Sequence, residues 1–93
     1  MCIRDSYWDI LIGQGDYYNP KFLKNGERVQ REGYDTNIVT DLAINWMDRI
    51  RDKSKPFCLF IHHKATHRTW MPDLCYLDLY DEVIYPCLLY TSI

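Results

Sequence analysis

The stretch DTNIVTDLAINWMDRIRDKSKPFCLFIHH (residues 35–63) contains two hydrophobic patterns, and their order decides the fold. In the first half, apolar residues recur every three or four positions, which is the spacing of one helix face. These residues are Ile38, Val39, Leu42, Ala43, Trp46, Met47 and Ile50. We therefore predict a helix over about residues 37–52. The side chain of Asp35 or Thr36 is expected to cap its start. Basic residues complement the negative pole at its end, namely Arg49, Arg51 and Lys53.

The second half is a continuous apolar run. Residues 57–61 read Phe-Cys-Leu-Phe-Ile, without alternation, after a proline-led loop. A short run of this kind is typical of a strand buried on both faces in a parallel sheet covered by helices. A helix that leads into a central strand predicts an α/β layer fold. In such sheets ligands bind beyond the carboxyl ends of the strands, which is where residues 62–70 lie.

Turn signals surround this unit. Asn25-Gly26 separates residues 22–24 from residues 27–30, and this dipeptide favours a tight hairpin. The Gly-Gln-Gly stretch at residues 13–15 lacks the lysine and the longer glycine spacing of a phosphate-binding loop, so it predicts a turn. Pro72 can open a short helical turn over residues 72–80.

Composition excludes several classes of protein. With 93 residues, 47% of them apolar and 26% charged, the chain can hold at most one globular domain. Its formal net charge of -2 offers no broad basic face for nucleic acid, and no apolar run approaches the roughly 20 residues that span a bilayer. The four cysteines contain no CxxC pair, so neither a zinc ribbon nor a disulfide framework is indicated.

Both ends differ from the middle of the chain. MCIRDS (residues 1–6) and CLLYTS (residues 87–92) resemble translated sequencing-adapter remnants, which recur at the edges of fragmentary metagenomic assemblies. We predict that residues 1–6 and 87–93 are non-native, and that residues 7–86 are an internal piece of a longer protein. The alternative is that both are ordinary termini, with residues 87–90 forming a short strand.

Three blocks point to one family. YWDILIGQGDYYNP (residues 7–20), GYDTNIVTDLAINWMD (residues 33–48) and KPFCLFIHHKATHRTWMPDLCYLDLYD (residues 55–81) resemble the type I sulfatases, especially bacterial carbohydrate sulfatases of the N-acetylglucosamine-6-sulfatase kind. The resemblance implies that residues 7–86 are part of a three-layer α/β domain like that of alkaline phosphatase. It also implies a periplasmic or secreted parent that acts on sulfated glycans, with the remainder of the domain as the partner of this piece.

The resemblance implies two cofactors that this piece does not supply. Family members use a formylglycine made from cysteine or serine, beside a calcium ion held by acidic and amide side chains. This chain has no Cys-x-Pro-x-Arg or Ser-x-Pro-x-Arg stretch, and it lacks the paired aspartates of the calcium site. We therefore expect the piece to be inactive alone.

The resemblance places the chemistry in the loop after residues 57–61. His67, within KATH (residues 64–67), matches the family histidine that contacts the sulfate and is the catalytic candidate. Thr66 stands where the family commonly has proline. Lys64 is a substrate-binding candidate because its positive charge can attract and orient the anion. Arg68 and Trp70 can form a sugar-binding edge, although Trp70 is equally compatible with packing under the loop.

Metal sites are weaker interpretations. His62, His63 and His67 supply enough ligands for zinc, but adjacent residues of a strand point to opposite faces. An acidic cluster lacks the ligand spacing of a calcium loop and is read as a solvated face; it comprises Asp73, Asp78, Asp81 and Glu82. No metal site is predicted.

The sequence thus predicts a fragment of a sulfuric ester hydrolase that acts on sulfated carbohydrates and contributes part of the sulfate pocket. Two alternatives stay open. One is a fragment of a phosphodiesterase with the same fold, and the other is a non-catalytic, anion-binding fragment.

Overall fold

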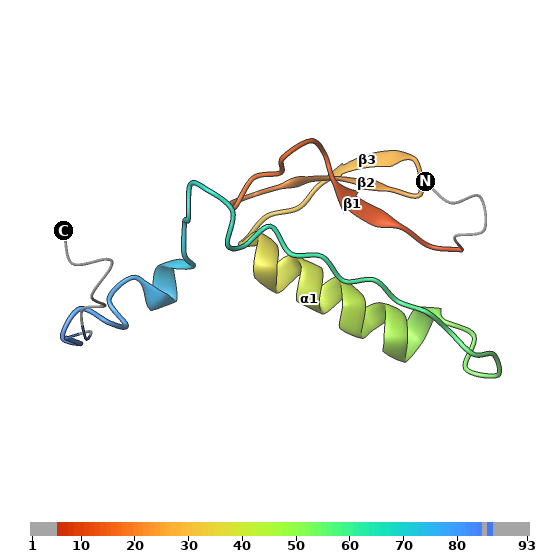
Figure 1. Cartoon of the computed structure of the whole chain (residues 1–93). Coiled ribbons are helices and arrows are strands. Elements are labelled where there is room, and N and C mark those ends of the chain that lie inside the picture. Colours follow the sequence, from red (N-terminus) through yellow and green to blue (C-terminus); the bar gives the residue numbers. More distant parts are fainter. Residues whose placement is uncertain (1–5, 85, 87–93) are drawn as a thin grey trace.

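The computed structural model describes residues 6–84 and 86. This part of the chain contains a three-stranded antiparallel sheet, in the order β1-β2-β3, and one α-helix, with an extended segment running beside the helix (Figure 1). The strands are β1 (Asp9–Leu11), β2 (Lys21–Lys24) and β3 (Glu27–Gln30). Helix α1 (Asp35–Asn45) continues into a π-helical turn (Trp46–Ile50), and a 3₁₀ turn (Leu74–Tyr76) follows much later.

The predicted hairpin is confirmed. β2 and β3 pair around Asn25-Gly26, whose φ angles are +47° and +94°. Positive φ at both central residues is what a type I′ turn requires, and glycine adopts it without steric cost. Asn25 also anchors the residue before β1. Its backbone amide donates to the Trp8 carbonyl, and its side-chain oxygen accepts from the Trp8 backbone amide, each at 2.9 Å.

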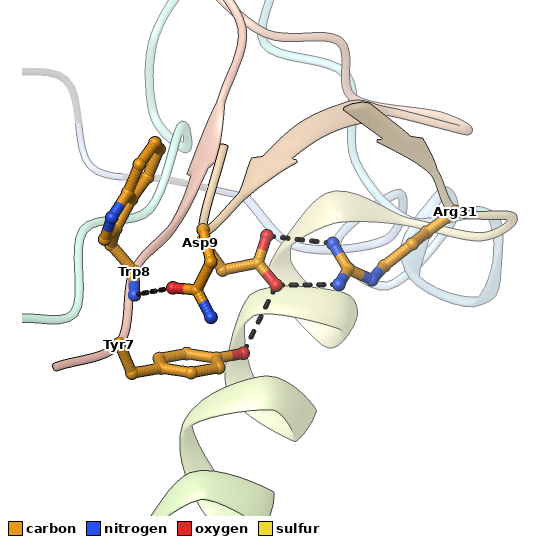
Figure 2. Close-up of polar contacts among 5 residues, drawn as sticks. Tyr7, Trp8, Asp9 and Arg31 are labelled. Atoms are coloured by element: carbon orange, nitrogen blue, oxygen red, sulfur yellow. Dashed lines mark hydrogen bonds and ion pairs between the residues drawn. The ribbon is translucent and has the colours of Figure 1, made fainter. Parts of the chain in front are cut away.

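A buried ion pair ties the first strand to the residue that follows β3 (Figure 2). The Arg31 guanidinium donates to both carboxylate oxygens of Asp9, at 2.9 and 2.7 Å, and the Asp9 side chain is only 4% exposed. The Tyr7 hydroxyl donates to the same carboxylate at 3.3 Å. Burial, followed by the charge of Asp9, raises the pKa of Tyr7. The guanidinium also lies 4.6 Å from the centroid of the Phe22 ring, so the pair rests on the small core.

The predicted helix is confirmed, but its predicted cap is wrong. Tyr34 is the N-cap residue, in extended conformation, and no side chain caps the helix. Asp35 is instead the first helical residue and is fully buried. At the other end the Arg51 Nε donates to the Met47 carbonyl at 2.9 Å, as expected for a basic residue beside unpaired carbonyls. Of the apolar stripe, Trp46 is the member that is buried, at 8% exposed.

The strand predicted at residues 57–61 is wrong for the described chain. These residues run beside α1 in extended form (Figure 1), and the Phe57 ring meets Trp46 edge-on at 5.6 Å. They form no ladder hydrogen bonds with other described residues, and Phe60 is 79% exposed. A strand exists only when a neighbour supplies the other half of the ladder. No other segment within residues 6–84 does so.

The remaining predictions have mixed outcomes. The turn at residues 13–15 is confirmed by a 3.1 Å hydrogen bond from the Gly15 amide to the Ile12 carbonyl. The short helical turn predicted over residues 72–80 is present as a 3₁₀ turn at Leu74–Tyr76, which begins two residues after Pro72. The three-layer arrangement of the whole domain stays a prediction. The expectations for residues 1–5 and 87–93 fall outside the described residues. None of the described helices is long and apolar enough to cross a membrane.

Candidate functional site

The loop of residues 64–72 carries all the predicted site residues and is built from two consecutive turns. The His67 amide donates to the Lys64 carbonyl at 2.9 Å, and the Trp70 amide donates to the His67 carbonyl at 3.0 Å. His67 therefore lies at the junction of the turns.

Lys64 reaches across to the first turn of the chain. Its Nζ donates a 2.8 Å hydrogen bond to the Gln14 carbonyl and lies 5.0 Å from the centroid of the Tyr17 ring. The carbonyl dipole and the face of the aromatic ring both stabilise the positive charge. The ammonium group is thus held at a defined place beside the turn of residues 13–15.

His67 is held in one tautomer. Its Nδ1 lies 2.7 Å from the Arg68 carbonyl oxygen, which can only accept a hydrogen bond, so Nδ1 carries the proton. The Nε2 atom has no partner among the described residues. With Nδ1 protonated, Nε2 accepts a proton while the ring is neutral and donates a hydrogen bond once the ring is cationic.

Lys64 and His67 line the same cavity, which has a volume of about 1140 Å³. Gly13 and Gln14 also line this cavity, and Gln14 is the residue that binds the Lys64 ammonium group. Apolar side chains, among them Trp46 and Phe57, line it as well. The structure therefore brings together the two residues that sequence reasoning assigned to the sulfate.

Arg68 and Trp70 do not complete this cavity. Trp70 is 70% exposed, so it does not pack under the loop, and it lines a separate cavity of about 250 Å³ with Tyr17 and Tyr34. Arg68 is exposed and lines neither cavity. The expected sugar-binding edge is thus not assembled as a pair here.

Asp35, which the sequence predicted as a cap, is a buried residue near the basic loop that lines neither cavity. It is fully buried, and neither carboxylate oxygen has a hydrogen-bond partner among the described residues. Burial raises the pKa of Asp35, against the opposing effects of the nearby Thr36 backbone amide and then of the charges of His63 and Lys64. A carboxyl group has therefore been buried close to the basic loop without a direct partner.

Sequence reasoning also missed three tyrosines. The hydroxyl of Tyr17 donates to the His67 carbonyl, that of Tyr18 to the Pro72 carbonyl, and that of Tyr34 to the Met71 carbonyl. The adjacent aromatic residues Tyr17 and Tyr18 next to a turn are a weak sequence signal, because ordinary core residues show the same pattern, and Tyr34 has no signal of its own. Burial raises the pKa of Tyr34, so its hydroxyl stays a donor at neutral pH.

The residues present do not fit the cofactors that the family resemblance implies. Among residues 6–84 and 86, no three histidine, cysteine or acidic side chains come together as a metal site. Cys58 and Cys75 are free and exposed, and neither begins a Cys-x-Pro-x-Arg stretch. No chemical step of this chain is therefore assigned to calcium or to formylglycine.

Comparison with known proteins gives close matches. The chain is 47% identical to an N-acetylglucosamine-6-O-sulfatase of Bacteroides thetaiotaomicron over 83 residues, which cover 86% of this chain and 15% of the relative. It is 42% identical to an uncharacterized sulfatase, YdeN, of Escherichia coli over 52 residues, or 55% of this chain and 9% of that relative. No protein-family model matches.

The fold agrees with these sequence matches. A solved structure of BT4656, in complex with its substrate D-glucosamine-2-N,6-O-disulfate, superposes with a TM-score of 0.84 and 45% identity over 90% of this chain and 17% of that one. The predicted resemblance to sulfatases is confirmed. The chain spans less than a fifth of the length of each of these relatives.

Proposed function

Because this chain corresponds in sequence and fold to one segment of a sulfatase, we propose that its parent protein hydrolyses sulfate esters of amino sugars. Within that enzyme the segment supplies one wall of the sulfate pocket through Lys64 and His67. The observation that carries this proposal is that Lys64 and His67, which one turn joins through the backbone, both line the same cavity.

The two residues have complementary tasks. The ammonium group of Lys64, fixed by the Gln14 carbonyl, attracts the sulfate and orients it. The cationic form of His67 donates from Nε2 to a sulfate oxygen or to the ester oxygen that leaves, where negative charge develops in the transition state. Donation from Nε2 requires that cationic form because Nδ1 already holds the proton of the neutral ring.

Arg68 and Trp70 are proposed to contact the sugar instead of the sulfate. An exposed guanidinium can bind hydroxyl or carboxylate groups, and an exposed indole can stack on a pyranose ring. Sulfated amino sugars are the proposed substrates because one relative is named as an N-acetylglucosamine-6-O-sulfatase and the similar solved structure holds D-glucosamine-2-N,6-O-disulfate as its substrate.

The rest of the parent would complete the domain. We assign to it the formylglycine, the calcium ligands and the strands that flank residues 57–61 in a three-layer α/β domain. The high exposure of Phe60 supports the proposal that other strands or helices of the parent pack against that segment. The parent is proposed to act in the periplasm or outside the cell.

A chimera tests the proposal. Residues 7–84 replace the matching segment of the Bacteroides N-acetylglucosamine-6-O-sulfatase, and sulfate release from N-acetylglucosamine-6-sulfate is compared with hydrolysis of a phosphodiester. The proposal predicts sulfate release within about tenfold of the unmodified relative, a change of about 1.4 kcal/mol. A folded chimera that cleaves only the phosphodiester, or that binds sulfate without turnover, contradicts it.

A further inference from the structure

Tyrosine hydroxyls fix the loop that carries His67. Tyr17, Tyr18 and Tyr34 each donate to a backbone carbonyl of residues 67–72, and the bond from Tyr34 to Met71 measures 2.6 Å. Among the described residues no backbone hydrogen bond joins residues 64–72 to a distant segment. The loop is therefore attached to the rest of the fold through side chains.

The three tyrosines form one platform. Tyr18 and Tyr34 pair as an isolated antiparallel bridge, flanked by 2.8 Å hydrogen bonds from the Asn19 amide to the Gly33 carbonyl and from the Asp35 amide to the Tyr17 carbonyl. The Tyr34 ring stacks on Tyr17 at 6.0 Å and meets Tyr18 edge-on at 5.3 Å. Backbone pairing and ring contacts that do not involve the loop thus hold the three donors in place.

The platform holds His67 by its contacts with the backbone of the loop. The Tyr17 hydroxyl binds the carbonyl of His67 itself, while the imidazole is oriented by the next carbonyl along the chain. The hydroxyls of Tyr34 and Tyr18 hold the far end of the loop at Met71 and Pro72. Because residues 67–72 are fixed at both ends, the backbone of His67 has little freedom to move, and the imidazole ring stays in one place.

We propose that Tyr17, Tyr18 and Tyr34 are positioning residues that hold the His67 loop and keep His67 in its Nδ1–H tautomer, with Nε2 directed to the sulfate. This inference rests on the proposed function for the role of Nε2, but the clamp itself is a property of this chain. Misplacing a reacting group by about 1 Å can reduce a rate about a hundredfold, so positioning alone can matter for catalysis.

The first test is nitrogen NMR of the 93-residue chain labelled with ¹⁵N-histidine, at a pH where the ring is neutral. We expect His67 to show a protonated Nδ1 and an unprotonated Nε2, and the triple variant Y17F/Y18F/Y34F to move toward the Nε2–H form that free imidazole of histidine favours. The same Nε2–H pattern in the unmodified chain overturns the inference.

The second test measures kinetics in the chimera described above. The triple variant is expected to lower kcat by about tenfold to a hundredfold with a smaller change in KM, since positioning acts on the transition state more than on binding. The control is Tyr76→Phe, which removes the hydroxyl of an exposed tyrosine that lines neither cavity. An inactive unmodified chimera contradicts the proposed function, whereas an active chimera with the same kcat in the triple variant contradicts the clamp alone.

Discussion

The ammonium group of Lys64 donates a 2.8 Å hydrogen bond to the backbone carbonyl of Gln14, a residue fifty positions earlier in the chain. This contact joins the basic loop to the turn after β1 and fixes a positive charge at the cavity that His67 also lines. Sequence spacing gives no hint of it, because neither residue type predicts the other.

Replacing Lys64 tests the value of that fixed charge. Lys64→Met keeps much of the side-chain length but removes the donor, so kcat/KM of the chimera should fall by tenfold or more, since hydrogen bonds from charged groups contribute about 1.5–3 kcal/mol. The matched control is Lys53→Met, because the Lys53 side chain is exposed and its nearest acidic partner is 3.9 Å away. Equal kcat/KM for both variants would contradict the assignment of Lys64.

The ion pair between Asp9 and Arg31 should dominate the stability of the sheet. Arg31→Met leaves the nearly buried Asp9 carboxylate without its bidentate partner, so the free energy of unfolding should fall by about 3 kcal/mol. Arg28→Met on β3 is the control, because Arg28 is exposed and should change stability by less than about 0.5 kcal/mol. Urea unfolding of the chain in dilute solution, followed by circular dichroism, measures both.

Local patterns were sufficient for the elements that are stabilised locally. The Asn25-Gly26 turn and the apolar stripe of α1 depend on neighbours within a few residues, and both were predicted correctly. Residues 57–61 were not, because a strand is defined by a partner that lies elsewhere. The apolar pattern describes the environment that the segment requires, and the described chain does not provide it.

The candidate site divides in the same way. Lys64 and His67 were proposed from a short block of sequence, since the family resemblance lies in consecutive residues, and their roles stay predictions. The tyrosine contacts and the burial of Asp35 could not, because each depends on how segments 17–18, 34–35 and 64–72 meet in space. A carboxylate at a helix start is normally an exposed cap, and only packing shows that this one is buried.

The buried Asp35 should make stability depend on pH. Its pKa is raised above the ordinary value of 3.8, so the carboxyl group is destabilising to the fold once it ionises. Below pH 3.8 the Asp35 carboxyl group is protonated in both the folded and the unfolded chain. As the pH rises through the folded-state pKa, the group ionises and the free energy of unfolding falls. Asp35→Asn should therefore stabilise the chain by about 1–3 kcal/mol at pH 7 and much less near pH 3.5.

Urea midpoints between pH 3.5 and 7 check this expectation. Asp41→Asn, an exposed position on the same helix, is the matched control and should change the midpoint little at any pH. A lower midpoint for Asp35→Asn at pH 7 would show that the ionised carboxylate has a stabilising partner.

The apolar segment at residues 57–61 should drive self-association of the chain. Phe60 is 79% exposed and lies in a run with no strand neighbour among the described residues, which is the arrangement that recruits other chains. Phe60→Lys should lower light scattering at high protein concentration, whereas Thr69→Lys, at an exposed loop position, adds the same charge without removing an apolar ring. Equal scattering by the two variants would assign the effect to charge alone.

If His67 contacts the sulfate during hydrolysis, one substitution shows it most directly. In the chimera, His67→Ala should lower kcat/KM for N-acetylglucosamine-6-sulfate by about 10²–10⁴, the usual contribution of a positioned proton donor. Thr69→Ala, at an exposed position of the same loop that lines neither cavity, should leave it within a few fold. If His67→Ala retains the activity of the unmodified chimera, His67 does not contact the sulfate and the account of this loop is wrong.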